Sequence, residues 1–95
     1  MSPDTALPAC RFRVPEEVVS EVIDGEAVVL HLATGKYYAM NRTASRIWQL
    51  LRDGVALEGI SWTISREFSI DLARSRADIE ALSAELQARG LLVRG

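Results

Sequence analysis

The dipeptide Asp24-Gly25 separates two runs of β-forming residues, and it restricts the fold of this chain more than any other feature. The runs are Glu17–Ile23 and Glu26–Leu32. A two-residue turn of type I′ needs positive φ at both positions, which Asp-Gly accepts, so the pattern predicts an antiparallel hairpin. A second turn signal, Ala33-Thr34-Gly35, precedes a short third run, Lys36–Met40. We therefore predict a three-stranded antiparallel meander with the second run in its centre.

After Asn41 the apolar spacing changes from every second residue to every third or fourth, which is typical of amphipathic helices. Asn41 is a suitable N-cap for a helix over Arg42–Arg52. Two more helices are predicted over Leu57–Phe68 and Leu72–Arg89. Asp71 caps the last one, Gly90 ends it, and residues 91–93 are expected to pack back on the core. The predicted fold class is α+β, with a winged helix-turn-helix-like order of three strands followed by three helices.

The domain is expected to span residues 12–95, after a flexible N-terminal arm over residues 1–11 that contains Pro3 and Pro8. The 95 residues suffice for one modest core but leave little room to enclose a substrate, which favours a binding module over an enzyme. The single cysteine, Cys10, fits a reducing compartment. We see no signal peptide and no apolar run of about 20 residues, so a cytoplasmic protein without a membrane partner is expected.

The residues that most often carry chemistry do not form a site in this sequence. His31 is the only histidine, and its spacing from Cys10 does not fit a metal site. Cys10 lies in the arm, where no base can be held beside it. We therefore predict no catalytic residue, no metal and no cofactor. Trp48 is expected in the core, whereas Trp62 is either a half-exposed packing residue or part of a contact surface.

Charge argues against a nucleic-acid partner. The first 40 residues hold three basic and six acidic residues, and the remaining 55 hold eight arginines and seven acids. Neither part has the basic excess that a phosphate backbone requires. A winged-helix DNA-binding protein stays an alternative, with Arg74, Arg76 and Arg89 on its third helix, although Asp78, Glu80 and Glu85 lie on the same helix.

The two edges of the predicted sheet differ. Pro15, Glu17 and Glu21 protect the first edge, whereas the third strand, Lys36–Met40, has two tyrosines and one charge. Either Phe12-Arg13-Val14 adds a short strand that covers this edge, or the edge is available to an incoming extended peptide.

One stretch resembles the PqqD family. It reads Thr34-Gly-Lys-Tyr-Tyr-Ala-Met-Asn-Arg-Thr-Ala-Ser-Arg-Ile-Trp-Gln-Leu-Leu-Arg-Asp-Gly54, with a Tyr-rich strand, a Met-Asn step, a small-residue helix start and Ile-Trp-x-Leu-Leu before Gly. The spacing to the helix with Leu57, Ile60 and Ile64, and the closing Leu86-x-x-Arg-Gly-Leu-Leu92, are also similar. The resemblance runs from about Glu17 to Val93, nearly the whole chain.

The resemblance implies a recognition element for ribosomally made, post-translationally modified peptides. Members of the family bind the leader part of a precursor peptide as an added strand and present it to modifying enzymes. The implied peptide-binding residues on the third strand are Lys36, Tyr37, Tyr38, Ala39 and Met40. Those on the third helix are Arg76, Ile79, Glu80, Leu82, Ser83 and Leu86. Ile79, Leu82 and Leu86 also have the spacing of core residues, so they line the groove, the core or both.

Free-standing members of about this length act in coenzyme PQQ synthesis or in other pathways, including lasso peptide biosynthesis. The N-terminal arm lacks a recognisable signature of the PQQ branch, which favours a non-catalytic lasso-type recognition protein. Its expected partners are a precursor leader peptide and a separate leader peptidase or other modifying enzyme. A chaperone of the PQQ precursor, with a radical enzyme as partner, is the alternative.

Overall fold

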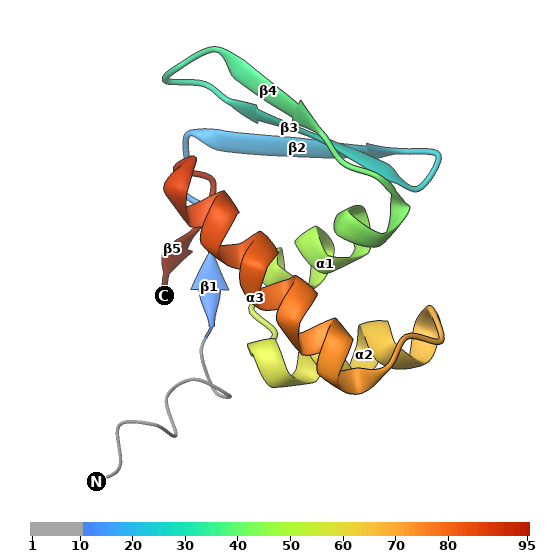
Figure 1. Cartoon of the computed structure of the whole chain (residues 1–95). Helices are drawn as coiled ribbons and strands as arrows, with labels where there is room; N and C mark the ends of the chain where they lie inside the picture. Colours follow the sequence, from blue (N-terminus) through green and yellow to red (C-terminus); the bar gives the residue numbers. More distant parts are fainter. Residues whose placement is uncertain (1–10) are drawn as a thin grey trace, which may run out of the picture.

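A computed structural model describes residues 11–95 of the chain, so the arm expected over residues 1–11 lies outside the described residues except for Arg11. Figure 1 shows a three-stranded sheet with all three helices on one side of it. The elements are, in order, β1 (Phe12–Arg13), β2 (Val18–Ile23), β3 (Glu26–His31), β4 (Lys36–Ala39), α1 (Arg42–Arg52), α2 (Leu57–Glu67), α3 (Leu72–Ala88) and β5 (Val93–Arg94).

The predicted meander is confirmed, with β3 paired antiparallel to β2 and to β4. Asp24 and Gly25 have φ of 53° and 81°, the positive values that the tight turn between β2 and β3 requires. Side chains alternate across the sheet, so Ala27 and Val29 are fully buried toward the helices. The neighbouring Val28 points to the other face and is exposed.

Helices α1 and α3 begin where their capping residues predict. The Asn41 side chain accepts a hydrogen bond from the Ala44 amide at 2.8 Å, and the Asp71 side chain accepts one from Ala73 at 3.1 Å. After α3, Gly90 adopts a φ of 76°, and the Leu91 amide donates to the Leu86 carbonyl at 2.9 Å. This turn returns Leu91 and the next residue to the core, where both are buried, as expected.

Trp48 on α1 joins the helices to the sheet. Its side chain is fully buried in the core, as predicted, and its Nε1 donates a hydrogen bond to Ser20 Oγ on β2 at 3.0 Å. Trp62 on α2 is instead 51% exposed. The two tryptophans therefore have different environments, and only Trp48 belongs to the packed interior.

The strand at Phe12 does not cover the edge of β4, so this alternative from the sequence is wrong. Phe12 and Arg13 pair antiparallel with Arg94 and Val93 of β5, and Figure 1 shows this pair apart from β4. The reason is packing: the Phe12 ring is buried in the same core as Leu91–Leu92, which brings β5 beside it. Within residues 11–95, the outer edge of β4 pairs with no strand.

Ser45 forms an unusual link where the chain passes from β4 into α1. In an antiparallel sheet, two opposite residues can exchange two backbone hydrogen bonds. Met40 and Ala27 form one of these, in which the Met40 amide donates to the Ala27 carbonyl at 2.9 Å. The second bond, from the Ala27 amide to the Met40 carbonyl, is replaced by the Ser45 hydroxyl, which accepts from the Ala27 amide at 2.6 Å and donates to the Met40 carbonyl at 3.2 Å. A fully buried side chain thus bridges two backbone groups that have moved apart as the strand leaves the sheet.

Replacing this hydroxyl is expected to destabilise the fold. Ser45→Ala leaves the buried Ala27 amide without a partner, which lowers the free energy of unfolding by about 1–3 kcal/mol. Urea denaturation followed by circular dichroism measures the change. Ser61→Ala is the matched control, because that buried hydroxyl donates only to the Leu57 carbonyl of its own helix. Equal losses in the two variants would contradict the bridging role.

Candidate functional site

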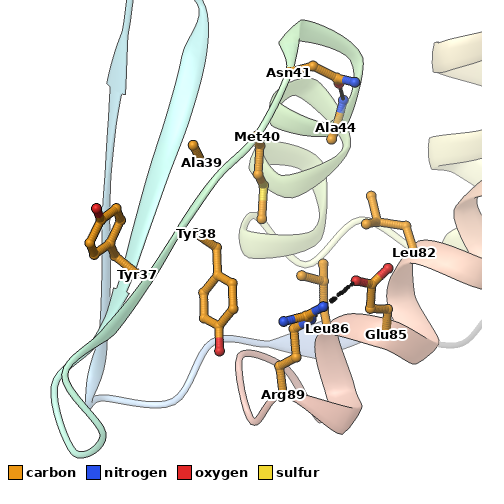
Figure 2. Close-up of a pocket in the computed structure, with 10 residues that line it drawn as sticks. All are labelled: Tyr37, Tyr38, Ala39, Met40, Asn41, Ala44, Leu82, Glu85, Leu86 and Arg89. Carbon is orange, nitrogen blue, oxygen red and sulfur yellow. Dashed lines mark hydrogen bonds and ion pairs between the residues drawn. The ribbon is translucent and has the colours of Figure 1, made fainter.

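A cavity of about 470 Å³ lies between β4 and α3 and opens to the surface beside the free edge of the sheet (Figure 2). Strand β4 and the following turn form one wall of the cavity, and the last two turns of α3 form the other wall. The first turn of α1 closes one end. The lining residues are Tyr37, Tyr38, Ala39, Met40, Asn41, Ala44, Leu82, Glu85, Leu86 and Arg89.

The backbone of β4 presents hydrogen-bonding groups to this opening. The amide of Met40 donates to β3, and in an antiparallel pair the amide and carbonyl groups of successive residues face alternately toward and away from the partner strand. Tyr38 therefore also faces β3, whereas Tyr37 and Ala39 direct their amide and carbonyl groups to the free edge. This edge carries two donors and two acceptors with the spacing that an added strand requires.

The side chains of β4 divide between the two faces of the sheet. Figure 2 shows Tyr38 pointing toward Arg89 and Met40 toward the helices, with Tyr37 on the opposite side of the strand. Met40 is buried, and Leu82 and Leu86 face it from α3. The cavity therefore has an apolar lining next to a polar backbone edge, a combination suited to an extended peptide with an apolar anchor.

An ion pair borders the apolar lining. Arg89 Nη2 lies 2.9 Å from Glu85 Oε2, and the Arg89 guanidinium carbon lies 5.0 Å from the centre of the Tyr38 ring. Hydrogen bonding to the Glu85 carboxylate raises the pKa of Arg89. Two donors of this guanidinium contact Glu85, which fixes its position above the tyrosine.

Six of the eleven residues that the resemblance implies line the cavity, namely Tyr37, Tyr38, Ala39, Met40, Leu82 and Leu86. The other five lie outside it. Lys36 is exposed at the start of β4, Glu80 is exposed on α3, and Ile79 is fully buried in the core. Ser83 is buried and donates to the Glu80 carbonyl, and Arg76 pairs with Glu58 of α2, with Nε 3.0 Å from Oε1.

Four lining residues were not predicted from the sequence: Asn41, Ala44, Glu85 and Arg89. A signal for two of them was present, because Leu82, Glu85, Leu86 and Arg89 are spaced i, i+3, i+4 and i+7 on one helical face. Asn41 and Ala44 lie in the cavity because β4 passes directly into α1.

The arginines considered for DNA binding are paired with acids. Arg74 lies 3.7 Å from Asp78, Arg76 pairs with Glu58, and Arg89 pairs with Glu85. Their charges are locally compensated, which disfavours a phosphate-binding role for α3.

Among residues 11–95, no three His, Cys, Asp or Glu side chains cluster in a way that suits a metal ion. Within the same range, no helix has the length and apolar character needed to cross a membrane.

Comparison with known proteins agrees with this geometry. The family described as "Coenzyme PQQ synthesis protein D (PqqD)" matches residues 26–92. The structure "TbiB1 in Complex with the TbiA(beta) Leader Peptide" is 38% identical with a TM-score of 0.80, over 84% of this chain and 93% of that chain. "Lasso peptide synthetase B1 complexed with the leader peptide" is 28% identical with a TM-score of 0.81, over 87% and 98%. No protein of curated function matches the chain.

The alternation along β4 leads to a prediction for the free protein. The amide hydrogens of Tyr38 and Met40 bond to β3, so they should exchange with solvent more than about tenfold more slowly than those of Tyr37 and Ala39. Hydrogen exchange followed by NMR measures the four rates. If the Ala39 amide were as protected as the Tyr38 amide, the edge would be covered and the assignment of its free groups would be wrong.

Proposed function

Because the chain belongs to the PqqD family, we propose that it is a recognition element that binds the leader part of a ribosomally made precursor peptide. The observation that carries the proposal is the edge of β4, which pairs with no strand of residues 11–95 and lies beside an apolar cavity. Both solved structures named above are complexes with a leader peptide, and one is a lasso peptide synthetase component. The pathway we propose is therefore lasso peptide biosynthesis.

In the proposed complex the leader adds a strand to β4. Its backbone pairs with the outward amide and carbonyl groups of Tyr37 and Ala39, which gives affinity without regard to the leader's side chains. Alternate leader residues then face the cavity, because side chains of a strand point to opposite faces in turn. An apolar anchor fits against Met40, Leu82 and Leu86.

The polar members of the cavity set the selectivity in this proposal. The paired Glu85 and Arg89 border the apolar lining and provide an acceptor and donors to a polar leader residue. Ile79 and Ser83, which were predicted to contact the peptide, support α3 from its buried side. Lys36, Arg76 and Glu80 are exposed outside the cavity and contact only a leader that extends past it.

The chain itself is proposed to act without catalysis and without a cofactor. It presents the bound leader to a separate leader peptidase, which fits the small size of the domain. The family description favours a second candidate, presentation of the PQQ precursor to a radical enzyme. The two candidates use the same edge and differ in the peptide, so titration with each precursor leader separates them.

A leader titration tests the proposal directly. The leader of the proposed lasso precursor, labelled with a fluorophore, is expected to bind with a Kd of about 1 μM or tighter, which corresponds to about −8 kcal/mol. Fluorescence anisotropy measures the binding, with the PQQ precursor leader and a scrambled lasso leader as controls. If neither the lasso precursor leader nor the PQQ precursor leader bound, the result would contradict a recognition function.

A proline at Ala39 is expected to weaken leader binding about tenfold while the domain stays folded. The substitution removes one donor from the free edge and none from the pairing with β3, and loss of one hydrogen bond corresponds to about 1.4 kcal/mol. Val22→Pro is the matched control, because the Val22 amide faces the opposite free edge, on β2. Unchanged affinity in Ala39→Pro, or an equal loss in Val22→Pro, would place the leader elsewhere.

A further inference from the structure

The face of the sheet turned away from the helices is apolar, and no element of residues 11–95 covers it. We define the outer sheet face by Val19, Glu21 and Ile23 of β2, Val28 and Leu30 of β3, and Tyr37 and Ala39 of β4. Tyr37 is 71% exposed and Ile23 58%. Of the seven large apolar side chains exposed within residues 11–95, four lie on this face, namely Val19, Ile23, Val28 and Tyr37.

These side chains form rows rather than isolated positions. The strand register places Val19 opposite Leu30, and Leu30 opposite Tyr37, in one apolar row across all three strands. Val28 lies opposite Ala39 in the next row. A hollow of about 450 Å³ is lined by residues that include Ile23. Single exposed apolar residues are common on protein surfaces, whereas a contiguous patch indicates an interaction surface.

Charge on this face identifies the kind of partner. The charged residues at the outward strand positions are Glu17 beside β2, Glu21 within it and Glu26 of β3, and all three are acidic. Lys36 alternates with Tyr37, so its side chain belongs to the opposite side of β4. A second copy of the chain would bring acids against acids, which disfavours self-association. An apolar patch with a basic rim is the complementary surface.

The outer sheet face is also continuous with the proposed leader site. A leader strand added to β4 lies beside Tyr37, and those of its side chains that do not enter the cavity extend the outer sheet face by one strand. A protein that covers this face would therefore contact the chain and its bound leader together. This property suits an enzyme that must act on the leader only when the leader is held.

We propose that the outer sheet face docks the enzyme that processes the leader, through an apolar surface with a basic rim on that enzyme. The inference rests on the proposed function and adds the partner's binding surface to it. The leader occupies the edge and the cavity, and the enzyme occupies the opposite face of the same sheet.

The test uses the full-length protein, the precursor leader that it binds and the purified leader peptidase that processes that precursor. The double variant Val19→Ser/Val28→Ser removes the centre of the patch, since both side chains are exposed and outside the core. Its affinity for the leader should stay within about twofold, whereas the affinity of the leader complex for the peptidase should fall more than about tenfold. Trp62→Ser, an exposed apolar residue on α2, is the matched control and should change neither affinity.

A charge variant tests the acidic rim independently of the apolar patch. Glu21→Lys should slow association with the peptidase and reduce the dependence of the rate on salt, while Asp78→Lys on α3 should not. If the double variant fails to fold, Glu21→Lys alone decides. The proposal would be overturned if Val19→Ser/Val28→Ser and Glu21→Lys both bound the peptidase as tightly as the wild type. It would also be overturned if the wild type formed a dimer that only Val19→Ser/Val28→Ser abolished. Absence of leader binding by the wild type is a separate result and would overturn the proposed function itself.

Discussion

The hydroxyl of Ser45 holds the position at which the sheet ends and the helices begin. Because it connects the Ala27 amide to the Met40 carbonyl, β4 separates from β3 at one defined residue and the chain turns directly into α1. The link therefore marks the C-terminal end of β4. Without it, a buried amide would lack a partner, and nothing in the sheet would fix where the strand ends.

The candidate site uses two kinds of interaction from two elements. The edge of β4 provides backbone groups that any extended peptide can pair with. In the proposed complex, side chains on the face of α3 distinguish one peptide from another. A domain of 95 residues can present both without enclosing its ligand. The helices are packed against one side of the sheet, and among residues 11–95 nothing covers the other side, where we propose that a second partner binds.

Local rules predicted most of the fold. The Asp24-Gly25 turn and the Asn41 cap depend on a few neighbouring residues, and both are confirmed. The pairing of Phe12–Arg13 with β5 was not predicted, because it depends on where the chain returns after Gly90. In the site, the resemblance to the PqqD family implied the apolar residues Met40, Leu82 and Leu86, whereas spacing alone left Leu82 and Leu86 open between core and groove. The contact of Arg89 with Tyr38 could not be predicted, because the two residues come from different elements of the fold. The same holds for the pairing of Arg76 with Glu58, which comes from another helix.

The antiparallel pairing of β1 with β5 joins the two extremes of the domain. Phe12 lies opposite Arg94, so the path of the chain enters and leaves the fold at neighbouring points. A domain with adjacent ends can be placed inside another polypeptide, or fused to one, without long linkers. It also tolerates circular permutation, in which a short loop joins β5 to β1 and new ends are opened at an exposed turn such as the one before Gly35. The architecture is therefore suited to reuse as a module within larger proteins.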